Sequence, residues 1–148
     1  MTMTATRPRP KGHPGYSETH PRIEATAPQA RGLVRTACAI WGLPDEVTEA
    51  ASVVMAELVS NAVRHASGPS VRVTVDRLGH ERVRLAVVDR APHRLPDLCA
   101  PEDEEQSGRG LVLVEAMSDR WGYDLLGPAR RPWGKRCWAE LAVKQVAL

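Results

Sequence analysis

One segment near the middle of the chain, residues 53–66 (VVMAELVSNAVRHA), constrains the fold most. Its apolar residues recur at three- and four-residue steps, the spacing of one face of a helix: Met55, Leu58, Ala62 and Ala66. Glu57 and Asn61 are four positions apart, so they lie one turn from each other on a common face of that helix. The segment therefore predicts an amphipathic helix that carries a carboxylate and a carboxamide on its polar side.

This polar pair has a structural interpretation and a chemical one. A Glu and an Asn at helical spacing usually belong to a solvated face. An amide oxygen is also a suitable ligand for Mg²⁺, and a carboxylate beside it can orient or deprotonate a nucleophile. The segments that follow Glu57 and Asn61 in the chain favour the chemical interpretation.

Two downstream segments have the features of a ligand-binding edge. Residues 84–92 (RLAVVDRAP) form a short apolar run that ends in Asp89 and is bounded by Pro92, as expected of a buried strand. A carboxylate at a strand end can accept a hydrogen bond from a ligand, although Asp is also a common turn residue. Residues 107–117 (SGRGLVLVEAM) place glycines before an apolar helical run, an arrangement that favours an anion.

In order and spacing, these segments and the closing run 134–141 (GKRCWAEL) resemble the nucleotide-binding domain of the GHKL superfamily of ATPases. Within it, the chain resembles the small anti-sigma-factor serine/threonine kinases and their actinobacterial relatives. ELVSNAVRHA resembles that family's N-box, VVDRAP its first glycine box and SGRGLVLVEAMSDRWG its second. The resemblance covers residues 22–144 and implies a two-layer α/β sandwich of the Bergerat type, in which a mixed, mostly antiparallel sheet carries helices on one face.

The resemblance also implies a function and a role for each matching residue. Glu57 matches the general base, Asn61 the Mg²⁺ ligand and Asp89 the residue that accepts a hydrogen bond from the adenine amino group. The other nucleotide contacts expected from the match are Ala91, Gly108, Arg109, Gly110 and Leu111. The implied activity is transfer of phosphate from ATP, with Mg²⁺, to a serine or threonine of a small antagonist protein. The alternative is a nucleotide-gated module that binds a sigma factor or an antagonist with little or no catalysis.

Two positions depart from the family pattern. Ala91 stands where the family has a glycine two residues after the aspartate, and alanine does not readily adopt φ > 0. Arg136 stands where the closing strand usually has a threonine near the adenine, and a long cation does not reproduce a short hydroxyl. The preceding residue, Lys135, is expected to lie at the surface. The departures affect recognition of the base and keep the binding-module alternative open.

The chain divides into an arm and one domain. Residues 1–20 are expected to be a disordered basic arm and residues 21–148 a single GHKL-like ATP-binding domain, because 1–22 hold four basic residues, one acidic residue and several Pro and Gly. The pattern predicts these further elements: a strand at 22–25, helices at 28–40 and from 45 through the 53–66 segment, a hairpin of strands 71–75 and 83–89, a loop at 92–107, a helix at 109–117, and strands at 121–125 and 136–143.

Composition limits the cellular setting and the partners. The net charge is +2, and the predicted domain has no basic face with interleaved aromatic residues, so direct nucleic-acid binding is not expected. Three cysteines without metal-ligand spacing, no signal-like segment and no apolar run of membrane length favour a cytoplasmic protein. The partners implied by the resemblance are an antagonist protein, a sigma factor, or both, and a second copy of the chain in a homodimer.

Overall fold

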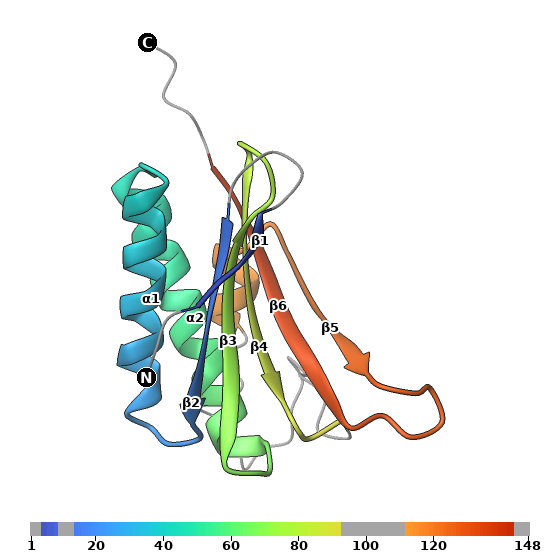
Figure 1. The fold of residues 1–148 in the computed structure, drawn as a ribbon. Helices are drawn as coiled ribbons and strands as arrows, with labels where there is room; N and C mark the ends of the chain where they lie inside the picture. The colour runs from blue at the N-terminus through green and yellow to red at the C-terminus, as the bar shows by residue number, and fades with distance from the viewer. Residues whose placement is uncertain (1–3, 9–13, 93–111, 144–148) are drawn as a thin grey trace.

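The computed structural model describes residues 4–8, 14–92 and 112–143 and has two layers. Strands form one sheet in the order β1-β2-β3-β4-β6-β5, and each described pairing is antiparallel. The strands are β1 Thr4–Pro8, β2 Pro14–Pro21, β3 Ser70–Arg77, β4 Arg82–Asp89, β5 Arg120–Leu126 and β6 Gly134–Ala142. The helices α1 Thr26–Ile40 and α2 Asp45–His65 lie together over one face of this sheet (Figure 1). The predicted two-layer α/β sandwich is confirmed.

The core lies between the helices and the sheet. Alternate residues of β3 and β4 point toward the helices and are almost fully buried: Val71, Val73, Val75, Val83, Leu85 and Val87. They meet the apolar stripe of α2, in which Val54, Met55 and Leu58 are buried. Burying each such side chain contributes about 1.5–3 kcal/mol. This packing holds α2 across β4 and β6, so the polar residues of α2 have a fixed place relative to the strand ends.

Most predicted elements form where the sequence places them. The hairpin is β3 and β4, the last two strands are β5 and β6, and the helix of the 53–66 segment is the second half of α2. The first helix begins at Thr26, two residues before the prediction, and Thr26 donates its hydroxyl hydrogen bond to the Pro21 carbonyl. Residues 112–117 are helical, which agrees with the described part of the helix predicted at 109–117.

The N-terminal predictions are corrected by the structure. β2, at Pro14–Pro21, pairs with β3, so residues 14–20, which were predicted to belong to a disordered arm, are part of the sheet. Residues 22–25 form no strand, so that prediction is wrong. The side chains of β2 that face the helices are Tyr16, Glu18 and His20, and the last two are joined at 2.7 Å. A strand whose inward positions are polar or aromatic lacks the aliphatic alternation that identifies a strand in sequence.

Among the described helices, none combines the length and apolarity needed to cross a bilayer.

Candidate functional site

Glu57 and Asn61 lie on α2, beside its buried stripe. Leu58 and Ala62, each one position further along, are buried against the sheet, whereas Glu57 and Asn61 are half-buried. Within the part of the chain that the structure describes, neither side chain has a hydrogen-bond or ion-pair partner. The packing of α2 therefore holds both groups in position, and no bond to another described residue engages their side chains.

Asp89 ends β4 on the same side of the sheet. It follows Leu85 and Val87 in the alternation, so its side chain faces the helix layer, and it is 2% exposed. The hydroxyl of Ser67, two residues after α2 ends, donates to the Arg90 carbonyl at 3.0 Å. This bond joins the end of α2 to the end of β4. The structure thus brings the second half of α2 and Asp89 to one end of the two-layer sandwich.

The turn after Asp89 is organised by the Asp89 carboxylate. The Ala91 amide donates to Asp89 Oδ1 at 2.8 Å, and Ala91 is buried. No non-glycine residue among the described ones has a positive φ, so Ala91 takes ordinary backbone angles. The turn therefore follows a path on which alanine is tolerated without the strain that φ > 0 would bring.

Lys135 lies against Asp89, contrary to the expectation of a surface residue. Asp89 and Lys135 are opposite each other in the β4–β6 register, and Lys135 Nζ is 2.9 Å from Asp89 Oδ1 and 2.8 Å from the Ala91 carbonyl oxygen. The Lys135 side chain is 3% exposed and the Asp89 side chain 2%. Buried charges of this kind are stable only when paired and hydrogen-bonded, as they are here.

Arg136, the residue expected near the base, lies on the other face of β6. It is opposite Val88 in β4 and Asp124 in β5, and it is half-buried. The alternation of β6 distinguishes Lys135 from Arg136 in the sequence. Lys135 is on the same face as the buried residues Cys137, Ala139 and Leu141, whereas Arg136 is on the other face. The cation that contacts Asp89 is therefore Lys135, whereas Arg136, the departure from the family pattern, faces away from it.

Gly134 allows β4 and β6 to approach closely at this point. A Cβ placed on Gly134 would be 2.4 Å from the Asp89 carbonyl oxygen, which is part of the backbone and cannot swing away. Cys137 lies two residues after Lys135, on the same face of β6. Burial raises the pKa of the Cys137 thiol to about 12; the Lys135 ammonium opposes the rise and the Asp89 carboxylate adds to it. This thiol is protonated and non-nucleophilic near neutral pH.

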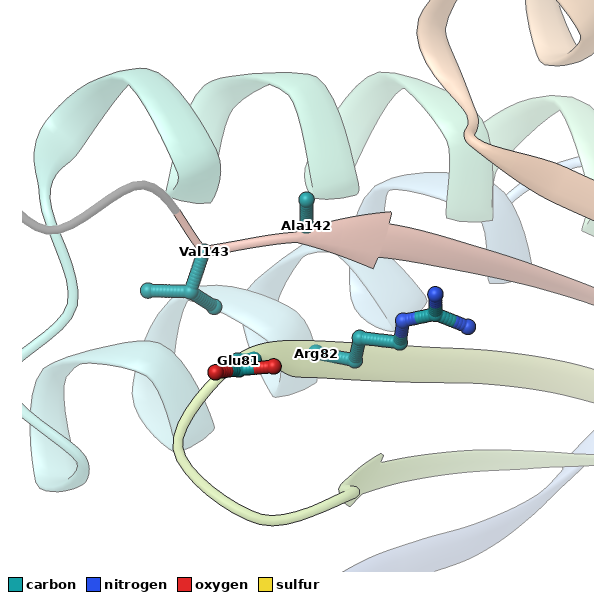
Figure 2. A pocket seen from close by; sticks show the side chains of 4 residues that line it. All are labelled: Glu81, Arg82, Ala142 and Val143. Carbon is teal, nitrogen blue, oxygen red and sulfur yellow. The ribbon is translucent and has the colours of Figure 1, made fainter.

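Four predicted phosphate-side residues, Gly108, Arg109, Gly110 and Leu111, lie outside the described residues. A hollow lined by Glu81, Arg82, Ala142 and Val143 is at the other end of the sheet (Figure 2). β4 runs from Arg82 to Asp89, so about 23 Å of strand, at about 3.3 Å per residue, separates this hollow from Asp89. The hollow is not part of the candidate site.

Comparisons with known proteins agree with this fold. The sequence profile of the family described as histidine kinase-like ATPase domain matches residues 20–131. An uncharacterized protein of Streptomyces coelicolor is 38% identical over 80 residues, which are 51% of this chain and 74% of that protein. The crystal structure of full-length ShkA in complex with AMPPNP is similar over 88% of this chain, with a TM-score of 0.52 and 19% identity. That likeness concerns the fold alone, and this chain spans 32% of the ShkA chain.

Proposed function

The chain belongs to the family of histidine kinase-like ATPase domains, and from this premise we propose that it is an ATP-dependent serine/threonine protein kinase of the anti-sigma-factor type. Binding of ATP with Mg²⁺ is the general property of this domain family. The proposal adds the phosphate acceptor, a serine or threonine hydroxyl of a small antagonist protein. The observation that carries it is the pair Glu57 and Asn61, one helical turn apart on α2 and without partners among the described residues.

Asn61 would hold the metal ion. Mg²⁺ in nucleotide sites keeps several waters and uses one or two protein ligands together with substrate phosphates, so a single amide oxygen suffices. When bound, Mg²⁺ supplies neutralisation of the phosphate charge. The neighbouring Leu58 and Ala62 are buried, so α2 is anchored on both sides of the proposed ligand.

Glu57 would act as the general base. It would accept the proton of the acceptor hydroxyl while that oxygen bonds to the γ-phosphorus. The bond between the γ-phosphorus and the β–γ bridging oxygen breaks, and ADP leaves. Such transfers depend mainly on positioning and on neutralisation of charge, and a carboxylate one turn from the metal ligand is suited to both tasks.

Asp89 would contact the base, and Ala91 and the segment Gly108–Leu111 would line the rest of the nucleotide site. A carboxylate accepts at two oxygens, and the described bonds from Lys135 and the Ala91 amide both end on Oδ1. The helix-facing position of Asp89, beside the end of α2, supports this role.

One observation favours a second function. Ala91 and Arg136 both depart from the family pattern, in the turn after Asp89 and in the closing strand, which weakens the argument for ordinary ATP recognition. The second candidate is a nucleotide-gated module that binds a sigma factor or an antagonist, as one copy or as a homodimer, with little or no phosphate transfer.

The test separates binding from transfer. Calorimetric titration with ATP, with and without Mg²⁺, should give saturable binding in the wild type that requires Mg²⁺ and is lost in Asn61→Ala. Purified candidate antagonist proteins are then incubated with the chain and with ATP labelled in its γ-phosphate. We expect Glu57→Gln to bind ATP and transfer no label, while the exposed Glu49→Gln on the same helix transfers it normally.

Each outcome decides between the candidates. Transfer that persists in Glu57→Gln would remove Glu57 from the role of base. Binding without labelled product, for every acceptor tried, would favour the nucleotide-gated module. A folded wild-type protein that binds no ATP at millimolar concentration would contradict both candidates.

A further inference from the structure

Strand β5 forms one edge of the sheet. It pairs with β6 on one side and has no neighbour on the other side among the described strands, and Figure 1 shows it at the border of the sheet. Its seven residues, Arg120–Leu126, include neither proline nor lysine, which commonly protect an edge strand from pairing with another chain. At the opposite edge, β1 ends in Pro8. Of the two edges, β5 is therefore the one suited to pairing with a further strand.

The side of β5 that faces the helix layer is apolar and partly exposed. Trp121, Tyr123 and Leu125 alternate along this side, opposite the inward-facing residues of β6. Trp121 packs against the core, whereas Tyr123 is 40% exposed and Leu125 50% exposed. An edge strand that leaves large apolar side chains in water favours pairing with another chain, because pairing removes their surface from water.

The other side of β5 carries two opposite charges, one on each side of a glycine. Arg120, Gly122 and Asp124 alternate along this side. The Arg120 side chain is 60% exposed and the Asp124 side chain 51%. Each makes one ion-pair contact within the sheet, with Glu140 and Arg84 respectively, and both contacts have the long distance of 3.7 Å. Both charged groups therefore remain accessible to a strand placed beside β5.

The segment Arg120–Asp124 is complementary to itself. When two copies run antiparallel with Gly122 opposite Gly122, Arg120 of each copy is opposite Asp124 of the other. Trp121 of each copy is then opposite Tyr123 of the other. Directly opposite side chains in an antiparallel pair have Cβ atoms about 4.5–5.5 Å apart, where opposite charges and aromatic pairs stabilise the sheet. The next register, centred on Tyr123, pairs neither charge with its opposite.

We propose that two copies of this chain associate through their β5 strands, antiparallel and with Gly122 opposite Gly122. A second copy is the occupant of this edge because the charges of β5 complement β5 itself. Backbone hydrogen bonds along the strands supply affinity, and the two pairs of Arg120 with Asp124 fix the register. No residue of β5 is among those proposed to contact the nucleotide, so this inference is independent of the proposed function.

Sedimentation equilibrium of the full chain measures the association. For the wild type we expect a reversible dimer with a dissociation constant of about 10–100 μM, because one pair of strands is a small interface. Asp124→Arg and Arg120→Asp each place like charges opposite each other, and each should raise the dissociation constant by at least about tenfold. Arg130→Asp is the matched control: it reverses a charge in the exposed turn after β5 and should leave the dissociation constant unchanged.

Mixing the two single variants tests the register. In a mixture of Asp124→Arg and Arg120→Asp, each copy meets the opposite charge on the other, so a heterodimer should form with about the wild-type affinity. The ion-pair contacts that each variant loses within its own chain stay lost in the mixture. Restored association therefore reports pairing between chains and not a repair of either fold.

The outcomes are distinct. A folded wild type that remains monomeric at millimolar concentration overturns the inference, as does a dimer that neither single variant weakens. A mixture that stays monomeric also overturns it. The double variant Arg120→Asp with Asp124→Arg keeps opposite charges facing each other and should associate like the wild type, so it decides the matter even if a single variant does not fold. A failure to bind ATP would refute the proposed function and leave this inference standing.

Discussion

Replacing Gly134 by alanine tests the close approach of β4 and β6 on which the site depends. The new Cβ would be 2.4 Å from the Asp89 carbonyl oxygen, and ordinary contact begins at 3.4 Å, so the strands must separate by about 1 Å. Forcing extra atoms into a packed region costs about 1–3 kcal/mol. Alanine recovers about 0.5–1 kcal/mol because it loses less backbone freedom than glycine on folding. The steric cost exceeds this gain, so we expect a net loss of about 1–2 kcal/mol.

Urea denaturation followed by circular dichroism measures this loss, and α1 supplies the control. A Cβ on Gly32 would meet nothing within 4 Å, so Gly32→Ala should raise the unfolding free energy by about 0.5–1 kcal/mol. The two substitutions are chemically identical and should have opposite signs. If Gly134→Ala were as stable as the wild type, the strands would lie further apart than described. The contact between Lys135 and Asp89 would then lose its structural basis.

Three further predictions concern the same end of β6. Because its pKa is raised to about 12 by burial, Cys137 should resist alkylation by iodoacetamide at pH 8 in the folded protein and react once the protein is unfolded. The pKa of this thiol in the folded protein lies above the unfolded value of 9.0. The thiol should therefore leave the unfolding free energy unchanged below pH 9 and lower it as pH rises from 9 to about 12. Urea titrations that compare the wild type with Cys137→Ala at each pH measure this difference. Lys135→Met should lose about 3–5 kcal/mol by leaving Asp89 charged and unpaired, whereas Asp89→Asn combined with Lys135→Met should recover much of that loss in the same denaturation assay. An equal loss in the double variant would mean that the pair is not coupled.

The elements predicted well are those with aliphatic periodicity. The second half of α2 and the β3–β4 hairpin bury Val, Leu and Met at regular steps, and local spacing is sufficient to identify them. β2 was not predicted from the sequence, because the residues that face the helices are Tyr16, Glu18 and His20. Their burial depends on pairing with β3, about 55 residues later in the chain. Such a partner cannot be found from a local pattern.

The site shows the same division between local and long-range information. Glu57 and Asn61 are related by one helical turn, so their proximity follows directly from spacing. Asp89 and Lys135 are 46 residues apart and meet only through the β4–β6 register. The preference of lysine for solvent predicted an exposed Lys135, but alternation with Cys137 and Ala139 puts it on the buried face, where the Asp89 carboxylate compensates its charge.

The two ends of the site can therefore change independently. The positions of Glu57 and Asn61 depend on the packing of α2. The described bonds of Lys135 go to Asp89 and Ala91 and not to α2, so a substitution of Lys135 should not displace the proposed base and metal ligand. Phosphate transfer depends on charge and position at the γ-phosphate, several bonds away from the purine. A change confined to the Asp89 end should consequently alter how tightly the nucleotide binds, while the rate of transfer from a bound nucleotide is preserved. In Lys135→Met, saturating ATP should support the wild-type transfer rate, and a rate that falls at saturation would show that the two ends are coupled.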